Sequence, residues 1–287
     1  MKRRTAGVLM GVLALVSLAL VLSVLYPFTT TDPVAANPPE ERFVVGDVDA
    51  FEVTASLVAD GETVIALDGV ATADGGWYQR VAEAGVVVEA YQARADAPVY
   101  VRETVTAADP ERVERRLASV AANEDSDLVC EDRDGDRVTF LVKRNGTDET
   151  QPVAGSASVF VNNLLLTEYE ATGVSSSGVS VYRPESGWYE SRATYRITNV
   201  SGEVRADADT HVVESAAVSF DMTGNVETYA GYVLARSFGD APTWTRLTYE
   251  FEPGDGDLER PAWVDDAEAA LDRRPGESRS DGSTVEC

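Results

Sequence analysis

Apolar and polar residues alternate with a period of two in several stretches of this chain, and that alternation restricts its fold more than any other feature. Clear examples are residues 51–57, 138–142, 193–197 and 247–251. Successive side chains of a strand point to opposite faces, so the pattern predicts a sheet with one buried and one hydrated face. Glycines, including that of an Asn-Gly pair at 145–146, separate the stretches and predict hairpin turns. The chain is therefore predicted to be mainly β, with antiparallel strands and a few short helices.

Two helices are expected within this pattern. Residues 109–120 open with Asp-Pro, which supplies an N-cap and a proline at the first helical position. Residues 156–169 place Phe160 and Leu164 on one helical face.

Short sequences recur at a fixed spacing and predict an internal duplication. Gly-Trp-Tyr at 76–78 recurs at 187–189, and Arg-Ala-Asp-Ala at 94–97 recurs at 205–208, both 111 positions later. Chance echoes in a sequence rich in Ala, Asp and Val are the alternative.

The predicted domain boundaries follow from this duplication. They give a first β repeat at 43–150, a second at 151–266 and a disordered acidic tail at 267–287. The two repeats are expected to form one curved antiparallel sheet, a half-barrel, rather than two adjacent lobes. Its concave apolar face would need helices or a ligand to cover it.

The N-terminus predicts a membrane anchor. Residues 6–25 are uncharged and follow Lys2, Arg3 and Arg4. As a helix, this stretch is long enough to cross a hydrocarbon core of about 30 Å. The basic end stays cytoplasmic by the positive-inside rule, which makes 1–28 a cytoplasmic tip with a single transmembrane helix, 29–42 a Pro/Thr stalk and the rest extracellular. A cleaved secretory signal, with a small-residue site at 34–36, is the competing interpretation.

The charge of the chain limits its partners and its habitat. Its 49 acidic and 24 basic residues give a net charge of −25, and Lys2 and Lys143 are its only lysines. Such a surface repels nucleic acid, which excludes nucleic-acid binding. At molar salt the Debye length falls to about 3 Å, so the same surface is tolerated there. The composition favours a halophilic, haloarchaeal protein over an acidic mesophilic surface domain.

Two kinds of covalent modification are predicted for an extracellular domain. Cys130 and Cys287 are the only cysteines, and they either form a disulfide or remain two unpaired thiols. Asn145 and Asn199 begin N-x-Ser/Thr sequences and are candidate glycosylation sites.

The sequence after residue 192 resembles a known family. The stretch at 195–229, the strand at 247–251 and the Glu-Arg-Pro-Ala-Trp ending at 259–263 resemble uncharacterised haloarchaeal surface lipoproteins. The resemblance covers about residues 45–266, but this chain lacks the lipobox cysteine that the family often carries, so lipidation does not transfer. More distantly, the pattern resembles lipoprotein-carrier half-barrels of the LolA/LppX type. That resemblance implies a concave apolar cavity for acyl chains, as an analogy of fold alone.

The sequence offers no recognisable catalytic constellation, so no enzymatic activity is predicted. His211 is the only histidine and lies in an expected strand, which favours a structural role. The acidic run at 131–137 starts like a calcium loop, but Arg137 and Lys143 occupy the positions that require Gly and Glu, so neither a metal nor a cofactor is expected.

The aromatic pairs of the two repeats are the candidate ligand-binding residues. They are Trp77, Tyr78, Trp188 and Tyr189, with packing in the core as their alternative role. The predicted function is a membrane-anchored, extracellular, non-enzymatic binding protein that holds an apolar or lipid-like ligand in a half-barrel. The alternative is a cell-envelope structural or interaction protein with a filled core that contacts other envelope proteins.

Overall fold

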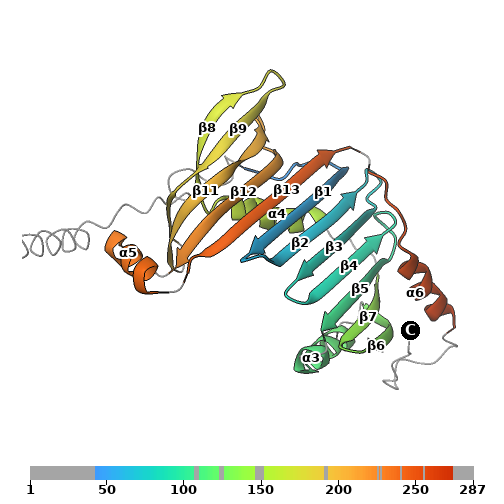
Figure 1. Ribbon diagram of the computed structural model, residues 1–287. Coiled ribbons are helices and arrows are strands. Elements are labelled where there is room, and N and C mark those ends of the chain that lie inside the picture. The colour runs from blue at the N-terminus through green and yellow to red at the C-terminus, as the bar shows by residue number, and fades with distance from the viewer. Residues whose placement is uncertain are drawn as a thin grey trace, which may run out of the picture.

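The computed structural model shows one large antiparallel sheet with short helices against it (Figure 1). It describes residues 43–106, 110–122, 126–145, 152–190, 193–224, 226, 228–239, 241–254 and 256–273. The predicted membrane span at 6–25 and stalk at 29–42 lie outside these ranges. Within them, no helix combines the length and the apolar content needed to cross a bilayer.

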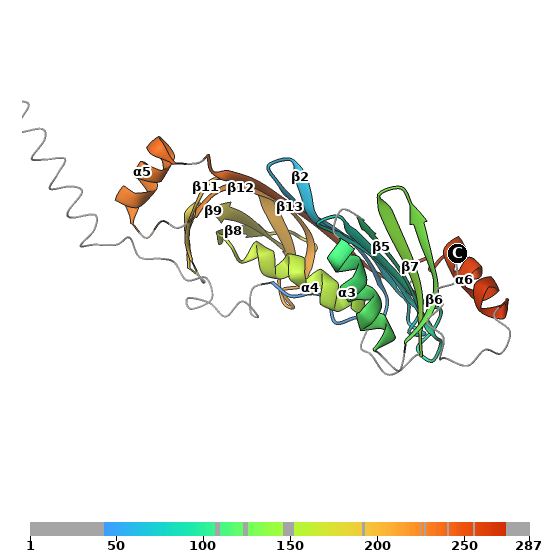
Figure 2. The ribbon, with the colours of Figure 1, turned by 90° about the horizontal axis from the view of Figure 1, so that it is seen from below.

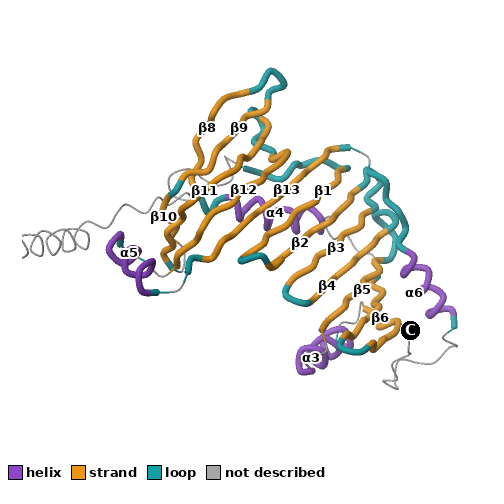
Figure 3. Tube along the Cα trace, in the orientation of Figure 1, coloured by secondary structure: helices purple, strands orange, loops and turns teal. Residues whose placement is uncertain are grey.

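The mainly β prediction is confirmed, and the strands belong to a single sheet that does not close. The first seven strands are β1 (Phe51–Ala59), β2 (Glu62–Ala71), β3 (Trp77–Glu83), β4 (Val86–Gln92), β5 (Val99–Thr106), β6 (Ser126–Asp134) and β7 (Arg137–Arg144). The other six are β8 (Glu168–Val174), β9 (Val179–Glu185), β10 (Gly187–Glu190), β11 (Thr194–Asp207), β12 (Val213–Gly224) and β13 (Thr243–Pro253). The spatial order is β6-β7-β5-β4-β3-β2-β1-β13-β12-β11-β9-β8, and β10 also pairs with β11 (Figure 3).

The sheet is curved, and two helices lie on its concave side: α3 (Pro110–Ala121) and α4 (Pro152–Leu164) (Figure 2). Alternate strand residues face them and form the main core, with Phe51, Leu67 and Tyr249 among its fully buried side chains. The helix expected at 109–120 is confirmed to within one residue. The helix expected at 156–169 begins four residues earlier, at Pro152, and ends five residues earlier, at Leu164. It ends there because the chain turns after Leu164, and Tyr169 already belongs to β8.

Helix α4 packs against the sheet where a glycine gives it room. It contacts β1, β2, β3 and β13, and buries Val153, Phe160 and Leu164. A Cβ atom at Gly69 of β2 would lie 2.5 Å from Cγ1 of Val153 and 3.2 Å from Cγ1 of Val53. Gly155 of α4 is exposed, and a Cβ atom there would have no neighbour within 4 Å. The two glycines therefore differ in the space around them.

Substituting these two glycines tests the packing of α4. Gly69→Ala should lower the free energy of unfolding by about 1–3 kcal/mol, because the added methyl group overpacks the core. Gly155→Ala should raise it by about 0.5–1 kcal/mol, because alanine favours the helix more than glycine does. Urea unfolding at molar salt measures both. Equal effects of the two variants would show that α4 does not rest on Gly69.

Another helix, α6 (Ala262–Asp272), covers part of the opposite, convex face (Figure 2). Its Trp263, Val264 and Ala267 pack on Tyr91 and Tyr100 of the sheet. The Arg102 guanidinium lies over the Trp263 ring, 5.4 Å from its centroid. The acidic tail expected from residue 267 therefore begins inside a helix, because the apolar residues at 263, 264, 267 and 270 follow a helical period.

A hydrogen bond from the sheet and an ion pair from the segment just before the helix hold α6 in place. The Tyr100 hydroxyl donates to Glu268 Oε1 at 3.0 Å, and Arg260 contacts Glu268 Oε2 at 2.6 Å. Burial, followed by the hydrogen bond to Glu268, raises the pKa of Tyr100 to about 12. Burial and the nearby Glu89 carboxylate raise the pKa of Tyr78 to about 12 as well.

Because the pKa values of Tyr78 and Tyr100 are raised in the folded protein, we expect its free energy of unfolding to fall at alkaline pH. A tyrosine with a pKa near 10 when unfolded and about 12 when folded contributes stability that is complete below pH 10 and is lost as the pH rises from 10 to 12. Tyr100→Phe should remove part of this pH dependence. Urea unfolding across that range, with absorbance of the ionised phenol, measures both quantities. A Tyr100→Phe profile as steep as that of the unsubstituted protein would contradict this.

Candidate ligand-binding site

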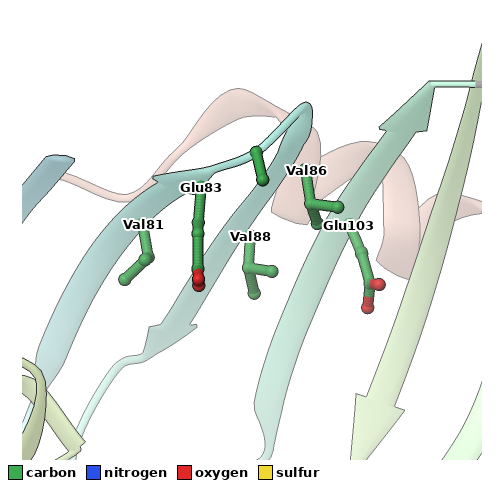
Figure 4. Close-up of a pocket in the computed structure, with 6 residues that line it drawn as sticks. Val81, Glu83, Val86, Val88 and Glu103 are labelled. Carbon is green, nitrogen blue, oxygen red and sulfur yellow. The ribbon is translucent and has the colours of Figure 1, made fainter. Parts of the chain in front are cut away.

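A pocket of about 260 Å³ lies on the concave face at β3, β4 and β5 (Figure 4). Its floor consists of Val81 from β3 and Val86 and Val88 from β4, which are half-buried. Strand register explains why they converge, because Val81 pairs with Val88 across the sheet and Val88 pairs with Glu103 of β5. Directly opposed residues share a face of the sheet, so these three side chains form one row.

Both helices of the concave side reach the neighbourhood of this pocket. The Ser156 hydroxyl of α4 donates to Gln79 Oε1 of β3 at 3.1 Å, two residues before Val81. On the other side, Nε of Arg116 of α3 donates to Glu103 Oε2 at 2.5 Å. The pocket therefore lies on the strip of sheet between the two helices.

Two carboxylates give the apolar pocket an acidic margin. Glu103 is only 8% exposed and projects from the apolar face, where Arg116 neutralises it. Glu83 is exposed and precedes the tight turn at Ala84 and Gly85, both of which have positive φ angles. An anionic head group would be repelled here, whereas an apolar chain with a neutral or cationic end would be accepted.

The pairing of Glu103 with Arg116 should be energetically important. Arg116→Gln leaves a nearly buried carboxylate without its partner and should lower the free energy of unfolding by about 1–3 kcal/mol. Adding Glu103→Gln should restore much of that loss.

The exposed pair of Arg94 and Asp96, at 2.6 Å, is the matched control, and breaking it should change stability by less than about 1 kcal/mol. Urea unfolding of the two double-mutant cycles compares them. Equal coupling in both pairs would contradict the role given to Glu103.

The predicted aromatic pair of the first repeat does not form one surface. Trp77 is buried in the core, and its indole Nε1 donates to Gln92 Oε1 at 2.6 Å. Tyr78, the next residue of the strand, packs on the other face, where its hydroxyl donates to Glu89 Oε1 at 3.1 Å. Adjacent residues of a strand cannot point the same way.

The second pair is also divided between the two faces, but here the tyrosine rather than the tryptophan packs against the main core. Arg196 of β11 lies over the Trp188 ring, 5.3 Å from its centroid. Tyr189 packs against Tyr195 and the main core, with the ring centroids 6.4 Å apart. None of the four aromatic residues lines the pocket at β3–β5, so their binding of a ligand stays a prediction.

Sequence reasoning missed the residues that do line this pocket. Val81, Val86 and Val88 resemble any strand valines, and Glu103 is one of 49 acidic residues. One signal in the sequence could have identified Glu103. In the stretch 99–105, where every second residue is apolar, Glu103 occupies a position at which an apolar residue is expected. A further polar atom on the concave face, the hydroxyl of Tyr249, is buried without a hydrogen-bond partner among the described residues. Burial also raises its pKa.

The remaining candidate residues lie apart from the pocket. Cys130 is buried beneath α6 and is disulfide-bonded; Cys287 lies outside the described residues, so its pairing with Cys130 stays a prediction. Asn145 and Asn199 are both exposed, and Asn199 Nδ2 donates to Asp221 Oδ2 at 2.6 Å. Glycosylation of either stays a prediction.

His211 lies in the turn where the chain enters the domain. The N–H of Val44 donates to the His211 carbonyl at 3.0 Å, and the His211 N–H donates to the Asp207 carbonyl at 3.0 Å. These backbone bonds join the entering chain to the start of β12.

No group of three or more potential ligand residues gathers closely enough to bind a metal ion in the described ranges. Comparisons of the chain with protein-family models, with curated proteins and with solved structures found no match. The class that fold and pocket define is an open, curved antiparallel sheet with helices on its concave side and a small apolar pocket between them.

Proposed function

We propose that this protein is a membrane-anchored, extracellular, non-enzymatic binding protein that holds one hydrocarbon chain of an apolar or lipid-like ligand. The observation that carries the proposal is the apolar strip between α3 and α4, where the described residues leave three valines half-buried on the floor of a pocket. Its volume of about 260 Å³ is slightly below the usual range for small-molecule sites, about 300–1,000 Å³. It suits part of a ligand, with the remainder extending along the strip.

The acidic margin narrows the class of ligand. Glu83 and Glu103 flank the valines, and Arg116, the cation that contacts Glu103, is already engaged. An anionic ligand would lack a free counter-charge at this margin. The proposed ligand therefore has an apolar chain and a neutral or cationic polar end.

Repetition of the fold supports the proposed duplication. Strands β5 and β7 are neighbours, and the chain between them forms α3 and then β6; β12 and β13 are neighbours, and the chain between them forms one helix, α5 (Tyr229–Phe238). The recurring stretch near Arg137 lies in β7, and its counterpart near Arg246 lies in β13.

The competing function is that of a cell-envelope interaction protein. The packed core beneath α4 favours it, since Leu67, Phe160 and Tyr249 are almost fully buried there. Under that function the acidic outer surface, rather than the concave face, would contact other envelope proteins.

Native mass spectrometry of the full chain, purified from its own membranes at molar salt, tests the proposal. We expect a co-purifying ligand with an apolar chain and no net negative charge. Val88→Glu should abolish its retention, because a carboxylate would occupy the apolar floor.

Val87→Glu is the matched control, because Val87 neighbours Val88 on the same strand but points to the opposite face. It should leave ligand retention unchanged. A protein that carries no ligand, or equal retention by both variants, would favour the interaction function instead.

A further inference from the structure

Helix α5 exposes most of its apolar side chains. Tyr229, Val233, Leu234 and Phe238 are all exposed, the last to 87%, and Ala230 is the only buried residue of the helix. Leu234 and Phe238 are four positions apart and share a face, which Val233 flanks. Figures 1 and 2 show α5 standing clear of the sheet, where β12 leads into it and β13 leaves it. Such a surface does not contribute to the core.

The charge of α5 differs from that of the rest of the chain. No acidic residue occurs from Thr228 to Gly239, although the chain carries 49, and Arg236 is the one charged residue of the helix. At 100° per residue, Arg236 lies about 200° around the helix from both Leu234 and Phe238 and so points away from them, whereas Tyr229 lies on the same side as Arg236. An exposed apolar face opposite a lone cation is typical of helices that lie in a membrane interface.

Further aromatic residues lie close to α5 in the sequence or within it. Trp244, at the start of β13, is 39% exposed. The backbone N–H of Trp244 donates to Asp60 Oδ1 at 2.9 Å, and the backbone N–H of Asp60 donates to the Trp244 carbonyl at 2.8 Å. Tyr229 and Tyr232 contact each other, with ring centroids 6.0 Å apart. Tyrosine and tryptophan are enriched at membrane interfaces.

The predicted stalk at 29–42 is long enough to let the end of the domain that carries α5 reach the bilayer. The described chain enters beside the start of β12, where Val44 pairs with Val212, and α5 follows the far end of that strand. Strand β12 spans about 40 Å at roughly 3.4 Å per residue. The predicted stalk at 29–42 has a contour length of at most about 50 Å.

We propose that α5 inserts the apolar face that carries Leu234 and Phe238 into the outer surface of the membrane that anchors the chain. This rests on the membrane anchor of the proposed function but not on its ligand. Insertion fixes the domain at a second point, with the end that carries α5 against the bilayer.

Site-specific fluorescent labels on the full chain in vesicles of phosphatidylcholine and phosphatidylglycerol test this proposal at molar salt. A label at Phe238→Cys should be quenched by nitroxide lipid and protected from aqueous iodide. Val174→Cys, a position 65% exposed on the β8–β9 hairpin, is the control and should show the reverse. The signal of the unsubstituted labelled protein is subtracted. Adding Leu234→Glu to the Phe238→Cys variant should abolish its quenching by lipid; because both side chains are exposed, neither change should unfold the domain.

Other outcomes separate this proposal from the proposed function. A Phe238 label that is quenched by iodide while the chain stays on the vesicles overturns the α5 proposal alone. A label protected from both quenchers, with dimers in native mass spectrometry, shows that a second copy covers α5 and also overturns it. Release of the chain from the vesicles overturns both the anchor and the α5 proposal, whereas the lack of a co-purifying ligand affects only the binding function.

Discussion

The pairing of β1 with β13 is the interaction on which the rest of the structure depends. Phe51 pairs with Pro253 and Ala59 with Thr245, so the first and last strands of the chain are neighbours over nine residue pairs. This seam converts two runs of strands into one sheet. The seam also forms part of the surface on which α4 packs, because α4 contacts β1, β2, β3 and β13 and so crosses it. Helix α4 therefore occupies the middle of the concave face, and the pocket lies to one side of it at β3–β5.

The period-two alternation predicted the strands well because each strand has one face on the core and one in water. It could not predict that β1 and β13 are partners, since their pairing depends on the arrangement of the whole sheet. The two helices that were missed show a different limit. Helix α6 has a helical period, but it lies where a tail was expected, and the apolar residues of α5 are exposed, so a search for core-facing patterns passes over it.

The pocket at β3–β5 was not found from the sequence, because the candidate ligand-binding residues were chosen for their recurrence in the two repeats. Trp77 and Trp188 recur at the same spacing, yet the first hydrogen-bonds Gln92 within the core and the second lies under Arg196. Each aromatic residue is explained by packing on its own strand pair. The pocket instead forms where three strands bring ordinary valines together with Glu103. That convergence depends on strand register, which alternation alone does not fix.

The central position of β13 has a consequence for how the chain matures. Strand β13 is made late, so β1 has no partner on one side until nearly all of the described strands have been synthesised. During that interval the half-sheet from β1 to β7 presents an open backbone edge next to an uncovered apolar face, a combination that invites pairing with another chain. Dense negative charge opposes such pairing where two chains come into contact, because like charges at contact distance are the least screened by salt. The acidic composition thereby protects the unfinished protein as well as hydrating the finished one.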